Sequence, residues 1–209
     1  MMKKFNYTRE EIKIFRKLNT PAKIQDYLNS LPFNFEKEGG TCMSPRKVLK
    51  TQKAHCVEGA IFAATVLEFN GHKPLILDLR STEKPYDFDH VLAIFKKFGC
   101  FGAISKTNHA VLRYREPIYK TIRELVMSYF HEYFLNSSGH KTLREYSKLF
   151  DLNYFNKLDW RTSEKNLFEI PEYLDGIKHF PMLSKEQVKN LRKADNVEIE
   201  AGKIVEYKK

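Results

Sequence analysis

The sequence predicts an α+β fold in which a helix beginning at Cys56 packs on a small antiparallel sheet, with further helices before and after this core. Small and apolar residues recur at three- and four-residue steps from Cys56 to Leu67, which is the period of a helix face. Short apolar runs follow at 75–79 and 90–95, with the length and composition of strands. The chain has 209 residues, 42% of them hydrophobic, which is enough for one domain with a core of its own.

Three short helices are predicted in the N-terminal segment, residues 1–53. Thr8 and Glu11 form a capping box at the start of the first helix. Each of the next two helices starts with a hydroxyl residue followed by proline, in Thr20-Pro21 and Ser44-Pro45, and this pair suits the N-cap and the first helical position. The three helices are expected at about 9–18, 21–28 and 45–51.

A core built around the cysteine-bearing helix is expected at residues 54–139. Asn70-Gly71 supplies a left-handed stop for the helix that begins at Cys56. The strands are expected at 75–79, at 90–95 and in the returning stretches 103–104 and 110–114, followed by a long helix from Pro117 to about residue 136.

A C-terminal extension, residues 140–209, is expected to pack on the core. Its first part, 141–180, holds short aromatic-rich segments that suit chain lying over a core. Its last part shows a capped helix and then an alternation of apolar and charged residues that favours a hairpin. The helix is expected from Ser184 to about Ala194, and the hairpin strands at 197–200 and 203–207.

The net charge of +10 is concentrated in the N-terminal segment. Residues 1–53 carry 12 Lys and Arg against 5 Asp and Glu, whereas the counts nearly balance in 54–140 (10 against 9) and in 141–209 (14 against 12). The excess lies on expected helices and is not interleaved with aromatic residues, which favours a solvated face over a nucleic-acid surface. We expect at most a weak, non-specific contact of residues 1–53 with an acidic partner or nucleic acid.

Several classes of function lack the residues they need. The three cysteines have no C-x-x-C spacing, so neither a disulfide framework nor a zinc site is favoured. The nine glycines form no phosphate-binding loop or dinucleotide fingerprint. No apolar run approaches the roughly 20 residues of a membrane span, and residues 1–7 lack a secretory apolar region. We therefore expect a cytosolic protein that needs no membrane, metal or cofactor.

Cys56 is the candidate nucleophile, because the first turn of a helix stabilises a thiolate through its free amides and its dipole. The same amides could bind a developing oxyanion. His90 begins a strand two elements later and is the candidate general base and acid. Gln52 is a candidate side-chain donor to the oxyanion, although a solvated glutamine at a helix end is the simpler interpretation. For an isolated cysteine, burial as a small apolar residue is also the simpler interpretation.

The third candidate comes from the geometry of a hairpin. A hairpin centred near Gly99 places Asn108 opposite His90, where its side-chain carbonyl would orient the imidazole. A one-residue bulge would put Thr107 or His109 there instead.

The residues around Cys56 resemble a known family. Residues 54–67, which begin AHCVEGA, are followed by a glycine stop and an apolar strand, and this arrangement resembles the cysteine-helix motif of the transglutaminase-like superfamily. In that family a histidine and then an Asp or Asn lie on successive strands. The similarity covers about residues 45–115. The chain differs from the family in lacking an aromatic residue and an aspartate at their usual places after His90, and in having His55 where a small residue is common.

The resemblance implies a papain/transglutaminase-like fold and thiol-dependent acyl chemistry on an amide or isopeptide bond, by hydrolysis or acyl transfer. Cys56 would be the nucleophile, His90 the general base and acid, and Asn108 the residue that orients the imidazole, with no cofactor. The substrate would be a protein or peptide. The alternative is a catalytically inactive protein of the same fold that binds an acidic partner or nucleic acid.

Overall fold

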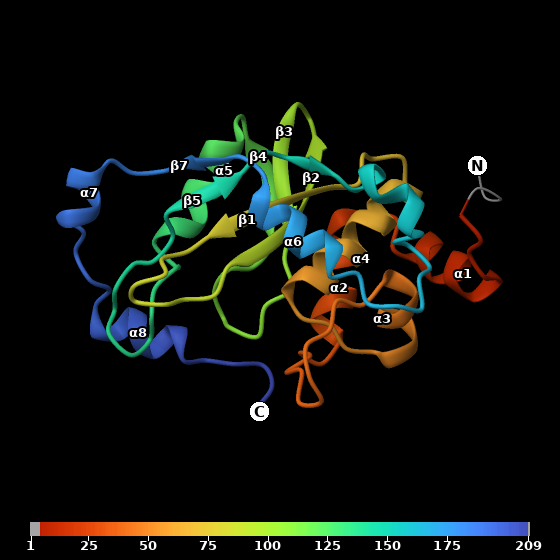
Figure 1. Cartoon of the computed structure of the whole chain (residues 1–209), viewed down its shortest axis with the longest axis horizontal. Coiled ribbons are helices and arrows are strands. Elements are labelled where there is room, and N and C mark those ends of the chain that lie inside the picture. The colour runs from red at the N-terminus through yellow and green to blue at the C-terminus, as the bar shows by residue number, and fades with distance from the viewer. Residues whose placement is uncertain (1–4, 209) are drawn as a thin grey trace.

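Within residues 5–208, seven strands form one antiparallel sheet with helices on both of its faces (Figure 1). The structure is a computed structural model that describes these residues; residues 1–4 of the basic segment and Lys209 lie outside the described residues. The strand order is β4-β3-β2-β1-β5-β7, and β6 also pairs with β1. The strands are β1 (Leu75–Arg80), β2 (His90–Lys97), β3 (Cys100–Ile104), β4 (Arg115–Tyr119), β5 (Glu145–Ser147), β6 (Phe150–Asp151) and β7 (His179–Pro181).

The three N-terminal helices are confirmed, each with its predicted cap. The hydroxyls of Thr8, Thr20 and Ser44 accept hydrogen bonds from amides three residues later, at 3.1, 3.3 and 3.2 Å. In the described part of the chain, no helix is long and apolar enough to cross a membrane. The helices are α1 (Arg9–Lys17), α2 (Pro21–Ser30), α3 (Pro45–Thr51), α4 (Cys56–Phe69), α5 (Ile122–Phe130), the 3₁₀ helix η1 (Leu152–Leu158), α6 (Glu169–Gly176), α7 (Lys185–Lys189) and α8 (Asn196–Gly202).

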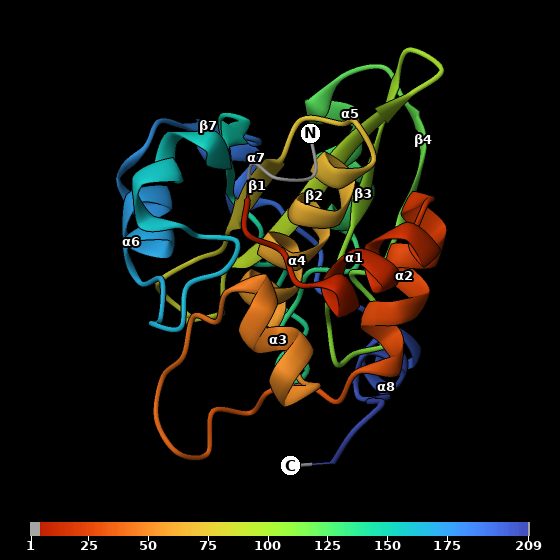
Figure 2. The same ribbon diagram turned by 90° about the vertical axis from the view of Figure 1, so that its right-hand side faces the viewer.

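The sheet separates two apolar layers, because side chains alternate along its strands. On β2, Val91 and Ala93 join the buried cluster of α1–α4, whereas Leu92 and Ile94 join the cluster formed with α5. Figure 2 shows α4 in front of β1–β3, with α1, α2 and α3 around it. Residues 1–53, 54–139 and 140–209 all contribute to the first cluster; Phe15, Phe62 and Trp160 are examples.

Helix α4 depends on a glycine for its close packing. A Cβ atom added at Gly59 would lie 2.4 Å from the Cβ of Lys106, in the chain that follows β3. Only glycine allows the helix backbone to approach this segment so closely. The cysteine-bearing helix therefore packs on an antiparallel sheet, as predicted.

The prediction of a strand at 110–114 is wrong. Strand β3 ends at Ile104, and the pairing of the chain with β3 resumes only at β4, which begins at Arg115. At Ser105 the backbone N–H and carbonyl bond the side chain of Gln25 at 2.9 and 2.7 Å. These bonds take the backbone groups that would have continued the strand pairing, so the chain turns away.

The long helix predicted from Pro117 is also wrong at its start. Pro117 lies inside β4. The strand tolerates a proline because it is at the edge of the sheet and needs no amide donor on its outer side. The helix α5 begins later, after a capping box of Thr121 and Glu124, and ends at Phe130.

Two further corrections concern the C-terminal extension. The predicted terminal hairpin is wrong, because Asp195 and Glu198 cap the helix α8 over part of that segment. Its predicted last helix exists but is shorter, since α7 ends at Lys189. The region 141–180 also contributes β5, β6 and β7, so the sheet is larger than the small sheet predicted.

Candidate active site

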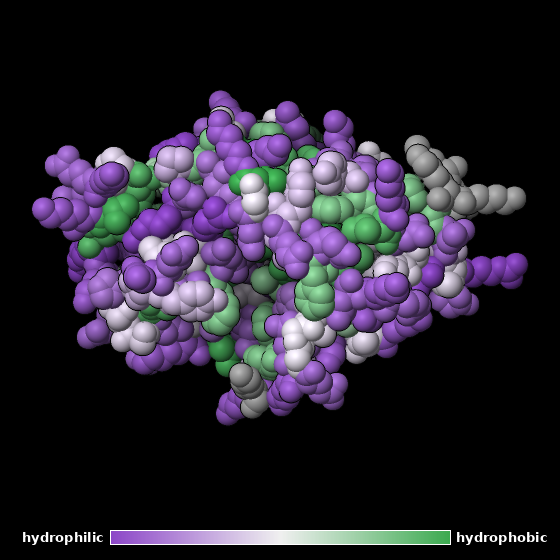
Figure 3. All heavy atoms as spheres, in the orientation of Figure 1, coloured by the Kyte–Doolittle hydropathy of each residue, from purple (hydrophilic) through white to green (hydrophobic). Residues whose placement is uncertain are grey.

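A cleft of about 530 Å³ opens beside the start of α4. Its lining includes the three candidates Cys56, His90 and Asn108. Aromatic and aliphatic side chains supply much of the remaining wall, from the segments after α2, β3 and α5 and from the loop before β2. The surface is visibly hollowed in this region, between the N-terminal helices and α8 (Figure 3). The lining includes Phe33, Phe35, Phe88, Leu112, Tyr133 and Phe134.

Cys56 is the first residue of α4 and is partly exposed. Burial by itself raises the pKa of the thiol, but hydrogen bonds from His55 and His90 outweigh burial and lower the pKa to about 6. The thiolate is therefore the main form of Cys56 at neutral pH. The first amides of a helix have no partner within the helix, so those of Cys56 and Val57 can face a developing oxyanion.

His90 lies between the thiol and a serine hydroxyl. Its ring hydrogen-bonds the Cys56 thiol, and its Nε2 lies 2.7 Å from the Oγ of Ser105. The single hydroxyl proton of Ser105 is donated to the carbonyl of Leu112 at 2.5 Å, because a carbonyl can only accept. Ser105 must therefore accept from Nε2–H of His90. This fixes the imidazole tautomer and leaves Nδ1 as the basic nitrogen.

Ser105 is itself held from a distant helix. Gln25 of α2 accepts from the backbone N–H of Ser105 and donates to its carbonyl. The side chain of Gln25 is buried and also donates to Asn29 at 2.8 Å. The residue that faces Nε2 of His90 thus has a rigid position.

Asn108 lines the cleft, but it holds the C-terminal segment and does not bond His90. Its side chain donates to the carbonyl of Tyr207 and accepts from the N–H of Tyr207, both at 2.9 Å. Backbone bonds from Ala110 to Ile204 and from Glu206 to Asn108 complete this attachment. The structure therefore brings Asn108 near the site but gives it a different partner.

The hairpin register explains the difference. Ala93 of β2 pairs with Ile104, the last residue of β3, so the pairing of the two strands ends three positions short of His90. Ser105 reaches His90 from the turn that follows. The alternatives Thr107 and His109 are engaged elsewhere, since Thr107 accepts from the N–H of His109 at 3.1 Å and the His109 ring lies 3.2 Å from the carbonyl of Gly202.

Gln52 is not brought to the cleft. It ends α3 in a left-handed conformation with φ of 53°, and this turns its side chain toward α2. There its amide donates to the Tyr27 hydroxyl at 3.2 Å and to the Leu49 carbonyl at 2.7 Å. Gln52 therefore does not reach the cleft as an oxyanion donor.

The other two cysteines differ from Cys56. Cys42 is only 1% exposed, and burial raises the pKa of its thiol to about 12. Cys100 lies partly exposed on β3, and neither residue lines the cleft. All three are free thiols.

Two residues that the sequence reasoning did not assign to the site take part in it. Ser105 follows a predicted strand directly, but no local signal shows that the strand pairing ends there. His55 is visible in the sequence beside Cys56, and only its contacts show a role. Its ring hydrogen-bonds the thiol and lies 3.0 Å from the carbonyl of Thr41.

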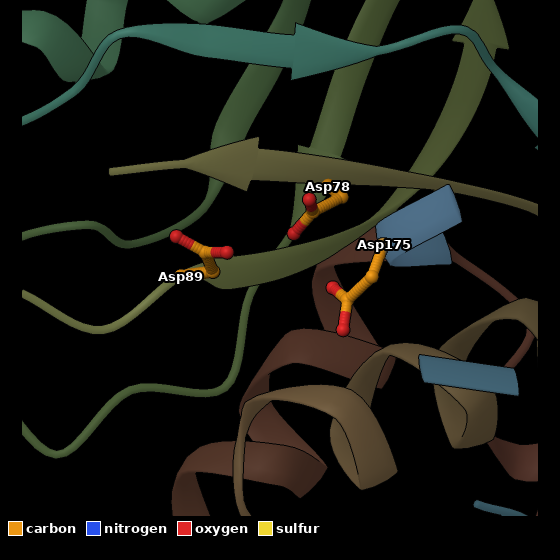
Figure 4. A group of neighbouring side chains, drawn as sticks. All are labelled: Asp78, Asp89 and Asp175. Carbon is orange, nitrogen blue, oxygen red and sulfur yellow. The ribbon is translucent and has the colours of Figure 1, made fainter. Parts of the chain in front are cut away.

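A cluster of carboxylates lies outside the cleft. Asp78 of β1, Asp89 before β2 and Asp175 of α6 bring carboxylate oxygens within 4.8 Å of one another (Figure 4). Burial raises the pKa of Asp78 above its ordinary value, although the 3.0 Å hydrogen bond with His179 opposes this shift. Asp89 accepts from the N–H and hydroxyl of Ser81. Protein partners thus account for two of the three carboxylates.

No protein-family model matches the sequence, and no curated protein matches it either.

Proposed function

We propose that this chain is a cysteine-dependent enzyme of the transglutaminase-like, papain-like type, which cleaves or exchanges an amide or isopeptide bond. The observation that carries the proposal is the sequence of contacts from the Cys56 thiol to the His90 ring and from there to the Ser105 hydroxyl. A thiol and an imidazole in one cleft, with a buried acceptor that orients the imidazole, are the parts needed for nucleophilic acyl chemistry.

The reaction follows from these positions. The Cys56 sulfur forms a bond to the carbonyl carbon of the substrate, and the carbonyl oxygen becomes an oxyanion beside the first amides of α4. The oxyanion collapses, the carbon–nitrogen bond breaks, and His90 gives the departing amine the proton that its Nδ1 took from the Cys56 thiol. Water or a second amine then loses a proton to His90 and attacks the thioester. This step releases an acid or a new amide and restores the Cys56 thiolate.

The fold supports the same proposal. The cysteine begins a helix on the face of an antiparallel sheet, and the histidine begins the second strand after it, in the order found in the transglutaminase-like superfamily. Ser105, at the end of β3, takes the place that an Asp or Asn holds in that family. A hydroxyl orients the imidazole without stabilising its charge as a carboxylate would, which favours modest turnover.

The lining of the cleft favours a protein or peptide substrate with an apolar side chain near the reacting bond. Phe33 and Phe35 stack edge to face on one wall, with ring centroids 5.2 Å apart. Phe88 lies on another wall and is 74% exposed. Exposed aromatic side chains at a cleft offer large apolar contact areas to a ligand.

An activated ester tests the proposal without knowledge of the natural substrate. Mixing the protein with p-nitrophenyl acetate should give a burst of nitrophenolate as Cys56 is acylated, and mass spectrometry should place the acetyl group on Cys56. Added hydroxylamine should speed turnover if the thioester accepts amines. Cys56→Ser should lose the burst, whereas the matched variant Cys100→Ser should keep it. A burst that survives Cys56→Ser, or acetyl groups spread over all three cysteines, would refute the proposal.

A further inference from the structure

His55 has a charged environment that His90 lacks. Its Nε2 lies 3.0 Å from the carbonyl of Thr41, 3.4 Å from a carboxylate oxygen of Glu58 and 3.7 Å from one of Glu36. A carbonyl oxygen can only accept, so Nε2 of His55 carries a proton. The same ring hydrogen-bonds the Cys56 thiol. One imidazole thus lies between two carboxylates and the reactive sulfur.

Glu58 lies in the first turn of α4, where its buried carboxylate faces His55. Its side chain is fully buried, at 0% exposure, and it accepts hydrogen bonds from four donors. A buried carboxylate is costly unless it is both hydrogen-bonded and paired with a cation, and the cation in the salt bridge here is His55. The four donors are Asn34 Nδ2, Thr41 Oγ1, Met43 N and His55 N.

The partner of His90 is different in kind. Its Nε2 donates to the neutral hydroxyl of Ser105, and no carboxylate forms a salt bridge with it within residues 5–208. A neutral partner orients the ring and leaves it able to gain and lose a proton during the reaction.

We propose that the two imidazoles divide the catalytic work at Cys56: His55 stays an imidazolium that stabilises the thiolate, while His90 carries the proton to and from the reacting groups. This rests on the proposed function, since it assigns roles within that same site. It also gives a function to the histidine that stands where the family usually has a small residue.

The titratable groups around the pair are consistent with this division. Burial lowers the pKa of His55, but its contacts with Cys56, Glu58 and the Thr41 carbonyl outweigh burial and raise the pKa to about 9. Glu36 faces the ring from the segment after α2.

Cys42 and Tyr133 lie within electrostatic range of the Cys56 sulfur, and both stay neutral because burial raises their pKa values. The lasting charges next to the thiolate at neutral pH are therefore those of His55 and of the carboxylates that hold it.

The experiment measures the pH dependence of iodoacetamide alkylation at Cys56, together with the p-nitrophenyl acetate burst and turnover. His55→Gln should lower the alkylation rate at about pH 6 by about tenfold or more, since the thiol pKa rises toward its ordinary value of about 8.5. His90→Ala should lower that rate by less than His55→Gln does and yet abolish turnover after the burst, because deacylation needs its general base. His140→Gln, which changes an exposed histidine outside the cleft lining, should match the unaltered protein.

A second variant distinguishes a change in the thiol pKa from a loss of folding. Glu36→Gln removes one carboxylate from a half-exposed surface position and should shift the alkylation profile in the same direction as His55→Gln, by a smaller amount. Unchanged profiles for both variants, with a strong shift for His90→Ala, would overturn the division of roles and leave the proposed function standing. If Cys56 in the unaltered protein reacts no faster than Cys100, the proposed function itself fails, and the inference fails with it.

Discussion

Nε2 of His90 lies 2.7 Å from the Oγ of Ser105, whose own proton is committed to the carbonyl of Leu112. This relationship fixes which nitrogen of His90 faces the thiol. The orientation of the imidazole therefore depends on where the Ser105 hydroxyl lies, and not on an acidic charge.

Replacing Ser105 should therefore affect turnover more than substrate binding. Ser105→Ala leaves Nε2–H of a buried imidazole without its acceptor, which costs about 1–3 kcal/mol of unfolding free energy. The ring then loses its fixed orientation, and we expect kcat for p-nitrophenyl acetate to fall about 10- to 100-fold with KM little changed. Ser105→Thr keeps the hydroxyl and should recover most of the rate. An unchanged kcat in Ser105→Ala would show that His90 needs no such partner.

Replacing Asn108 should lower the stability of the fold without slowing the chemistry at Cys56. Asn108→Ala removes two hydrogen bonds to Tyr207 and should lower the free energy of unfolding by about 1–3 kcal/mol. The alkylation rate of Cys56 should stay within about twofold of the unaltered protein, because Asn108 does not touch His90. Thermal unfolding and iodoacetamide kinetics on the same sample test this. A stable variant with slow alkylation would return Asn108 to the role of orienting residue.

The three thiols should separate by pH. With a pKa of about 6, Cys56 should alkylate at nearly its full rate at neutral pH and lose reactivity as the pH falls through about 6, since only the thiolate attacks. Cys42, whose pKa is about 12, should stay unreactive in the folded protein across this range. Peptide mapping after brief labelling measures each site. Equal labelling of Cys42 and Cys56 in folded protein would contradict the assigned environments.

Gly59 should not tolerate a side chain. In Gly59→Ala the new Cβ meets the Cβ of Lys106 at 2.4 Å, so α4 must move away from that segment. We expect a loss of about 1–3 kcal/mol in unfolding free energy. Gly176→Ala is a matched control, because a Cβ there meets nothing within 4 Å. Chemical denaturation of both variants gives the comparison, and equal stabilities would mean that the close approach is not needed.

The parts of the fold that could be predicted have local signals. The caps at Thr8, Thr20 and Ser44 and the glycine stop after α4 lie within a few residues of the elements they delimit, so the sequence is enough to find them. Cys56 and His90 are placed by the helix start and the strand start that carry them.

The parts that could not be predicted depend on distant residues. Ser105 faces His90 because Gln25, 80 positions earlier, takes its backbone groups and ends the strand pairing. The sequence pattern near residue 105 therefore does not predict that contact. The segment after Asp195 has an alternation that suits a hairpin, but its capping box with Glu198 favours a helix, and a local pattern does not decide between them.

The attachment of the C-terminal segment to the cleft wall has a kinetic consequence. Asn108 and Tyr207 are 99 positions apart, and their bonds close a loop of nearly half the chain. Contacts of such long range form late, because the entropy of closing the loop is lost before the contact is gained. The wall that carries Asn108 is therefore completed near the end of folding. In amide hydrogen exchange, its opening should be seen at lower free energies than that of the β1–β2 ladder.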